Sequence, residues 1–176
     1  DKHPDPIRFP SFRSLTDTLR RDGVHLMISV WPNMNKGEDH DAFKARNLFL
    51  PDSDVYDAFR PEAQDLYWAQ ARKDWLDNGT DAVWCDSAEP FTDADWHGET
   101  KRSDEERYRV VTADTARHLD ETLTLGYGRA HCRGLSERWR RDYPERRIVN
   151  LCRNGYAGAA ADGVLVWSGA ISATWE

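Results

Sequence analysis

The sequence predicts an α/β protein in which helices cover a parallel sheet, and three observations lead to this class. Four short apolar runs occur along the chain, and longer stretches with apolar residues at helical spacing separate them. Polar residues close each apolar run. This alternation predicts parallel strands joined by right-handed crossovers, so all four polar strand ends should lie at one edge of the sheet.

The first helix is expected over residues 11–23, with Ser11 as its N-cap and Gly23 as its stop. The apolar side chains at helical spacing are Phe12, Leu15 and Leu19. The run VHLMISVWP, residues 24–32, follows and ends near a proline. A short apolar run of this kind is typical of a strand buried on both faces.

The second helix is expected over residues 60–79, which begin near a proline and end at Asn-Gly. Its apolar face carries Leu66, Tyr67, Ala71 and Trp75. The helix leads directly into a strand, TDAVWCD at 80–86. Because side chains alternate along a strand, Trp84 and Asp86 should share one face, and Cys85 should point the other way, toward the helices.

The second half of the chain predicts a long helical stretch and two more strands. The helical stretch runs from 104 to 143, with a break into two helices near Gly126 and Gly128. The strands are RRIVNLCRN at 146–154 and GVLVWSG at 163–169, with small residues between them.

Two architectures place a site at the carboxyl ends of parallel strands. A (β/α)8 TIM barrel is favoured here, because a doubly wound sheet usually has a glycine-rich first turn and none is visible. Eight strand–helix units take about 250 residues. We therefore expect residues 1–176 to form roughly the middle four units of one catalytic domain, incomplete at both ends.

Composition limits the class of partner. The net charge of -7 is spread along the chain without a basic block, which argues against nucleic acid and anionic membranes and favours a neutral or cationic partner. No segment has the length of a membrane span or the apolar core of a signal peptide. The three cysteines have no metal-type spacing, and we expect them to be reduced and mostly buried: Cys85, Cys132 and Cys152.

Three segments resemble parts of glycoside hydrolase family 31. DAVWCDSAEP, residues 81–90, looks like the family's nucleophile segment, and RNGYAGAAADGVLVWSGAISATWE, residues 153–176, is similar to its downstream segment. MISVWPNM, residues 27–34, is similar to an earlier strand with a tryptophan in the sugar pocket. The resemblance extends from residue 9 to the end and implies a retaining α-glycosidase on a (β/α)8 barrel, without a cofactor or metal.

The resemblance assigns roles to individual residues. Asp86 matches the nucleophile, although an aspartate at a strand end can also simply cap the next helix. Glu89 is expected to be a supporting acceptor that orients the loop. Arg153 matches an arginine that binds the sugar, and a structural ion pair with Asp86 or Glu89 can coexist with that role.

Aromatic residues are expected to line the sugar pocket. Trp31 and Trp167 match the family's aromatics there, and Trp84 joins them because it shares a strand face with Asp86. An isolated tryptophan would otherwise be assigned to core packing. The histidines have no ligand spacing, and no chemistry is assigned to them: His97, His118 and His131.

The sequence departs from the family at Ala170, the position of the acid/base aspartate. Alanine cannot donate a proton, so activity on poor leaving groups should be impaired. Three explanations are open: an introduced substitution, a natural sugar-binding protein that does not cleave, or an acid supplied from elsewhere. Candidates for such a displaced acid are Asp93, Asp95 and Glu176. Residues 160–162 also differ from the family's usual Gln-Arg-Tyr.

The predicted function is hydrolysis of terminal α-linked sugars of the α-glucoside, α-xyloside or α-galactoside class through a covalent glycosyl-aspartate. A carbohydrate-binding pseudoenzyme and a transglycosylase are the alternatives. The expected partner is an oligosaccharide or glycoside, and the sequence does not predict the oligomeric state.

Overall fold

A computed structural model describes residues 2–89 and 102–169 and confirms the α/β class. Its four strands all pair in parallel, in the order in which they occur along the chain. They are β1 (Met27–Ser29), β2 (Ala82–Cys85), β3 (Asn150–Cys152) and β4 (Val164–Val166). Each strand is shorter than its predicted run, and the polar residues lie just beyond the carboxyl ends.

The α-helices are α1 (Phe12–Arg21), α2 (Glu38–Ala45), α3 (Pro61–Ala71), α4 (Asp104–Thr115) and α5 (Tyr127–Asp142). Helix α3 continues into a π-helical turn, η1 (Arg72–Leu76), and two 3-10 helices complete the described part, η2 (Glu121–Gly126) and η3 (Ala159–Asp162). Within the described ranges, no helix combines the length and the apolar character that a bilayer span requires.

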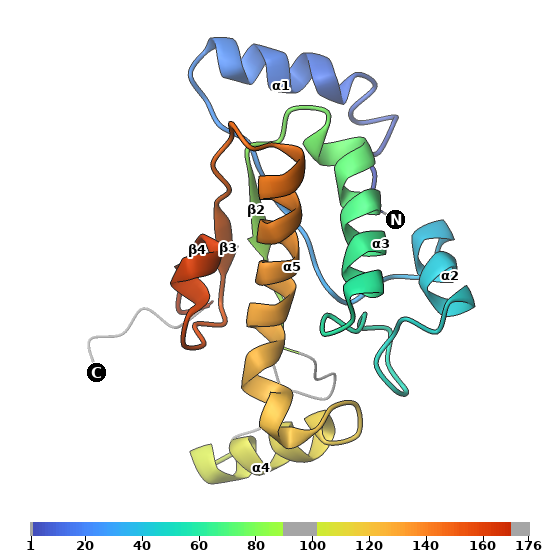
Figure 1. Ribbon diagram of the computed structural model, residues 1–176, viewed down its shortest axis with the longest axis vertical. Coiled ribbons are helices and arrows are strands. Elements are labelled where there is room, and N and C mark those ends of the chain that lie inside the picture. Colours follow the sequence, from blue (N-terminus) through green and yellow to red (C-terminus); the bar gives the residue numbers. More distant parts are fainter. Residues whose placement is uncertain (1, 90–101, 170–176) are drawn as a thin grey trace.

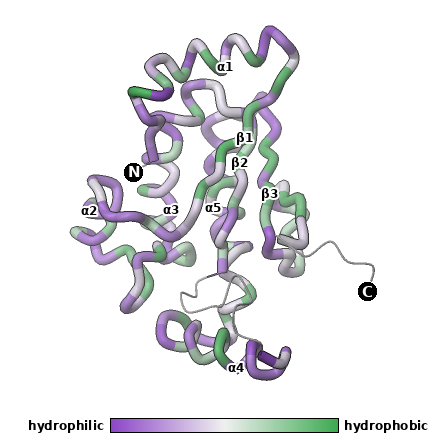
Figure 2. The backbone as a smooth tube through the Cα atoms, turned by 180° about the vertical axis from the view of Figure 1, so that it is seen from behind, coloured by the Kyte–Doolittle hydropathy of each residue, from purple (hydrophilic) through white to green (hydrophobic). Residues whose placement is uncertain are grey.

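The two faces of the sheet have different surroundings. Helices α3 and α5 cover one face (Figure 1), and Val83, Cys85 and Cys152 of the strands are buried against them. The opposite face is turned to the viewer in Figure 2, where no helix of the described part lies over it. On this open face, Trp84 and Leu165 keep 38% and 58% of their surface exposed. The predicted alternation of Trp84 and Cys85 is therefore confirmed.

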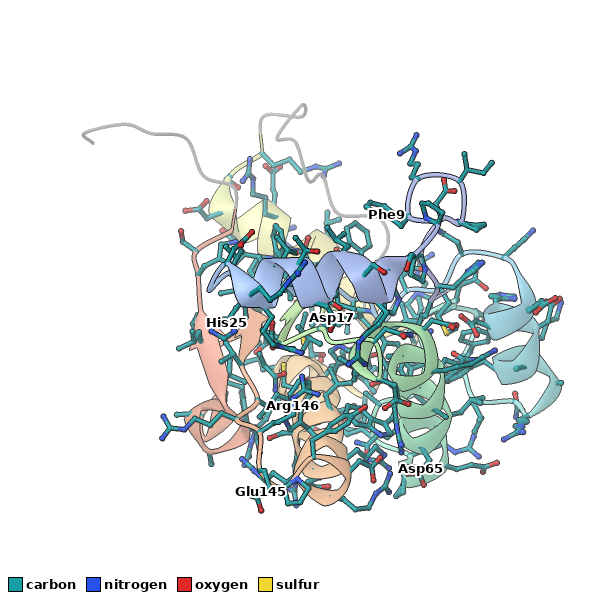
Figure 3. All side chains as sticks on the ribbon, turned by 90° about the horizontal axis from the view of Figure 1, so that it is seen from above. Phe9, Asp17, His25, Asp65, Glu145 and Arg146 are labelled. Atoms are coloured by element: carbon teal, nitrogen blue, oxygen red, sulfur yellow. The ribbon has the colours of Figure 1, made fainter. Side chains whose placement is uncertain are left out.

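The two ends of the sheet also differ. Helix α1 crosses the amino-terminal edge, and α4 lies beyond the carboxyl edge (Figure 1). Two α1 side chains fasten it to the turn before β2: Thr16 Oγ1 donates to Asn78 O at 2.6 Å, and Arg20 Nη2 donates to Gly79 O at 3.0 Å. Figure 3 shows α1 crossing this end above the turn that carries Arg146.

Three details of the predicted helices differ from the structure. Ser11 precedes α1, but its hydroxyl contacts Ser14 Oγ and makes no capping bond. The long helical stretch breaks earlier than expected, because α4 ends at Thr115 and the Asp120 carboxylate caps the amide of Thr122. Helix α5 begins directly after Gly126, but the chain passes from η2 into α5 without a break there, and Gly128 lies inside α5.

Helix α2 was not predicted, because its eight residues carry too few apolar positions to give a helical period. Acidic residues fill its first turn, which is a favourable arrangement at a helix N-terminus. This charge pattern is the sequence signal that could have indicated α2. The expectation that the three cysteines are reduced and buried is confirmed: Cys85, Cys132 and Cys152 are all free and buried.

Candidate functional site

Asp86 follows β2 directly and lies at the carboxyl edge of the sheet. Its Oδ1 accepts a hydrogen bond from the Ser87 amide at 2.8 Å, and its side chain is 21% exposed. Ser87 has a φ of +51°, which is uncommon for a residue with a side chain. The chain thus turns sharply after Asp86, and Ala88 anchors the turn in the core. The carboxylate is fixed and still accessible.

Arg153 reaches the same place from the neighbouring strand. Cys85 and Cys152 are paired in register, so the residues after them, Asp86 and Arg153, leave the sheet at the same level. Arg153 Nη1 lies 3.8 Å from Asp86 Oδ1. This contact places a positive charge beside the carboxylate.

Glu89 holds Arg153 in position. Its two carboxylate oxygens accept hydrogen bonds from Arg153 Nε at 3.1 Å and Nη2 at 3.0 Å, the two-pronged geometry that suits a guanidinium. These bonds raise the pKa of Arg153 above its usual value, against the opposing effect of burial. The structure therefore brings together three of the predicted site residues, Asp86, Glu89 and Arg153.

Two tryptophans lie together on the open face. The Trp84 ring of β2 and the Trp167 ring, which follows β4, have centroids 5.6 Å apart and planes at 78°. Trp84 and Leu165 belong to one row across the sheet, with Leu151 of β3 between them. The edge-to-face pair therefore spans the intervening strand.

Trp31 stands apart from that pair. It follows β1, is 49% exposed, and donates from Nε1 to Ser29 Oγ at 3.1 Å. A cavity of about 330 Å³ adjoins it, with walls that include Lys2, Asn33 and Asp39 but not Asp86. Within the described part β1 is paired on one side only, and the cavity lies by this edge strand. We therefore assign this cavity to the side of the sheet formed by strand β1, and not to the site around Asp86.

Other predicted residues fall into two groups. Ala170, His97, Asp93, Asp95 and Glu176 lie outside the described residues. His118 and His131 have partners that the sequence did not indicate: the His118 ring contacts Pro51 O through Nδ1 at 2.7 Å, and His131 Nδ1 contacts the Tyr56 hydroxyl at 2.7 Å. In residues 2–89 and 102–169, no group of three or more His, Cys, Asp or Glu is arranged to hold a metal ion.

Two residues of interest were missed from the sequence. Gly169, with a φ of +84°, lies so close to Arg153 that an added Cβ would come within 3.0 Å of Arg153 Cδ. Tyr67 of α3 was assigned to the apolar helix face, yet its hydroxyl donates to Trp31 O at 2.8 Å. No local pattern signals either contact, because each joins segments far apart in the chain.

Comparisons with known proteins agree on one family. The family model of the glycosyl hydrolases family 31 TIM-barrel domain matches residues 1–176. An uncharacterized family 31 glucosidase of Pseudescherichia vulneris is 29% identical over 98% of this chain and 32% of its own length. An alpha-xylosidase of Saccharolobus solfataricus is 24% identical over 97% of this chain and 22% of its own length.

Solved structures show the same similarity. A GH31 alpha-xylosidase from a soil metagenome, complexed with xylose, is 27% identical with a TM-score of 0.76 over 99% of this chain and 26% of its own. A xylosidase from Aspergillus niger, 20% identical with a TM-score of 0.74 over 96% of this chain and 27% of its own, supports the fold alone. The chain thus spans about a third or less of the proteins that it resembles. The predicted TIM-barrel fold is confirmed.

Proposed function

The chain belongs to glycosyl hydrolase family 31, and from this premise we propose that it is part of a retaining glycosidase acting on terminal α-linked sugars. Residues 1–176 would be the middle part of one catalytic (β/α)8 domain, incomplete at both ends. The observation that carries the proposal is the position of Asp86 at the carboxyl end of β2, 3.8 Å from Arg153. Barrel enzymes have their active sites at this edge.

Asp86 is the proposed nucleophile. One of its oxygens attacks the anomeric carbon, the bond to the leaving oxygen breaks as that oxygen takes a proton from solvent, and a covalent glycosyl-aspartate forms. Arg153 lies 3.8 Å from this carboxylate, and Glu89 keeps the guanidinium in place through its two hydrogen bonds. Water then attacks the anomeric carbon and gives a proton to solvent, the bond to Asp86 breaks with its electrons returning to the carboxylate, and the sugar keeps its original α configuration.

The open face of the sheet supports sugar binding. Trp31 and the pair formed by Trp84 and Trp167 present partly exposed aromatic surface near the carboxyl edge. Flat apolar rings of this kind suit the apolar faces of a pyranose, and Arg153 adds donors for its hydroxyl groups. We assign these four residues to substrate binding.

Position 170 is the proposed site of the acid/base group, and alanine leaves it without a proton donor. The contact of Gly169 with Arg153 supports this placement, since Gly169 directly precedes Ala170. We propose that this form loses about 10²- to 10⁴-fold in rate on substrates with poor leaving groups. An introduced substitution, a natural loss of cleavage and a displaced acid remain the three explanations of the alanine.

The alanine also favours a second candidate function. A protein that keeps Asp86, Arg153 and the tryptophans but lacks the acid would bind an α-linked sugar without efficient cleavage. A transglycosylase of the same family is a further alternative. Because relatives of this chain are named alpha-xylosidase and glucosidase, α-xylosides and α-glucosides are the first substrates to test, with α-galactosides next.

The experiment uses the full-length protein and α-glycosyl fluorides, with and without sodium azide. Fluoride departs with the bonding electrons and needs little acid assistance, so Asp86 should still form the covalent intermediate. Azide then attacks the anomeric carbon without a general base and releases the carboxylate. We expect an α-glycosyl azide, identified by NMR, and the sugar that reacts identifies the specificity.

The matched variant is Ala170→Asp. It should raise the rate on alkyl α-glycosides by about 10²- to 10⁴-fold and change fluoride turnover little, because only the former needs a proton donor. A protein that binds sugar but forms no azide product from any fluoride, with either residue at 170, would be a binding protein and not a glycosidase.

A further inference from the structure

The position of the Trp31 ring depends on the backbone that follows β1. The last sheet bond of this segment runs from the Val30 amide to Trp84 O at 2.8 Å, and the chain then leaves the sheet. Among the described residues, the exposed Trp31 ring donates from Nε1 to Ser29 of the same strand. A contact that fixes the backbone at residues 31–32 therefore also fixes the direction of this ring.

Two tyrosines hold that backbone from behind the sheet. The Tyr67 hydroxyl of α3 donates to Trp31 O at 2.8 Å, and the Tyr56 amide donates to Pro32 O at 3.2 Å. Consecutive carbonyls are thus bound from two different elements. Only the first of these two bonds comes from a side chain, so it can be removed without changing the backbone.

Tyr67 is itself rigidly held. It is 1% exposed, its ring stacks on that of Tyr56 with centroids 4.5 Å apart, and the His131 ring meets it edge-on at 5.2 Å. The Tyr56 hydroxyl is in turn 2.7 Å from His131 Nδ1. Burial raises the pKa of Tyr67 well above its usual value, so the hydroxyl stays protonated. The cluster is a fixed support with one donor directed at Trp31.

We propose that Tyr67 is a positioning residue, which fixes the Trp31 ring as a binding surface for the sugar. This inference rests on the function proposed above. Without the hydroxyl, Trp31 O loses a partner and its segment can shift, so the ring no longer lies where the sugar needs it. Asp86 is on another strand and keeps its own contacts. Substrate binding should weaken while the chemical step remains intact.

The test compares Tyr67→Phe with Tyr127→Phe in the full-length protein. Tyr127 is a matched control, because it is also fully buried in the same core and its hydroxyl also donates to a backbone carbonyl, that of Tyr56, at 2.6 Å. We expect Tyr67→Phe to raise the KM for the reactive α-glycosyl fluoride about 3- to 10-fold, the scale of one hydrogen bond, with kcat changed less than about twofold. Tyr127→Phe should lower only Tm.

A double-mutant cycle with Trp31→Ala shows whether Tyr67 acts through that ring. If it does, Tyr67→Phe should have no further effect on KM once the indole is gone. An equal effect in both backgrounds, or an equal KM change in the Tyr127→Phe control, would overturn the inference and leave the proposed function standing. If the parent protein neither turns over the fluorides nor binds the free sugars, the proposed function fails first, and the inference fails with it.

Discussion

The two edges of the sheet use arginine side chains for different purposes. At the amino-terminal edge, Arg20 and Arg146 donate to backbone carbonyls of the turn before β2, at 3.0 and 2.6 Å. At the carboxyl edge, Arg153 binds the Glu89 carboxylate and lies beside Asp86. Arg20 and Arg146 also lie 3.0 and 4.0 Å from the Asp81 carboxylate, so the difference is in the backbone acceptors. Donors given to backbone carbonyls hold a turn in place, whereas Arg153, between the partly exposed carboxylates of Asp86 and Glu89, is the arginine that we propose acts on a ligand. The comparison contrasts an edge that stabilises the fold with the edge that we propose is reactive.

The largest expected difference between the edges comes from neutralising one aspartate at each. Asp86→Asn removes the proposed nucleophile and should lower kcat on the glycosyl fluoride by about 10⁴-fold or more, the scale of losing an essential nucleophile. Asp81→Asn removes the partner of Arg20, 3.0 Å away, and should lower Tm with kcat changed less than about twofold. If both variants lost kcat equally, the proposed difference in role between the two edges would be wrong.

The next effect compares the same arginine change at both edges. Arg153→Lys cannot reproduce the two-pronged contact with Glu89 and the approach to Asp86, so kcat/KM should fall about 10- to 100-fold. Arg20→Lys should cost at most about 1 kcal/mol of stability, because this pair is partly exposed. Steady-state kinetics and urea unfolding of both variants measure the contrast, and an unchanged kcat/KM in Arg153→Lys would refute the assigned role.

A smaller effect tests the amino-terminal edge by itself. Gly79 has a φ of +98°, and an added Cβ would lie 2.6 Å from Thr16 Oγ1 of α1. Gly79→Ala should therefore destabilise the fold by about 1 to 3 kcal/mol. Gly23→Ala is the control, since its φ of +73° is also positive but nothing lies within 4 Å. It should cost less in urea unfolding, and neither variant should alter kcat.

The smallest effect is a pH dependence confined to the carboxyl side. His40 lies 2.9 Å from Asp54 and 3.3 Å from Asp41, and the hydrogen bond to Asp54 raises the pKa of His40 above its usual value near 6.5. A raised pKa contributes stability that is full below pH 6.5 and is lost as the pH rises through the folded-state value.

Urea unfolding across pH 5 to 9 measures this contribution. The parent protein should exceed His40→Gln by up to about 1 kcal/mol below pH 6.5, and the difference should shrink as the pH rises. A difference that grows with pH would contradict the assignment.

Much of the fold could be predicted from the sequence because local patterns determine it. Apolar runs and helical spacing gave all four strands and the helices α1, α3 and α5 near their observed places. Helix α2 was missed because it buries few apolar side chains. The early end of α4 was missed because capping by Asp120 competes with continuation of the helix.

The candidate site was predictable in its residues and less so in its contacts. The motif around Asp86 and the alternation of Trp84 with Cys85 follow from consecutive residues. The two hydrogen bonds between Glu89 and Arg153 depend on the register in which β2 pairs with β3, and no local sequence pattern predicts that register. The Tyr67 hydroxyl bond joins a helix to a strand end 36 residues away, so the apolar face of α3 indicated only core packing.

Chemical labelling of the buried cysteines can report how often this fold opens. Cys85 and Cys152 face the helices in register on adjacent strands, and Cys132 of α5 is buried in the same core. The neighbouring Cys132 and burial both raise the pKa of Cys152, which leaves almost no reactive thiolate. A thiol reagent can therefore modify these sulfurs only after α5 has separated from the sheet. The labelling rate would report how often that separation occurs, with no probe added to the protein.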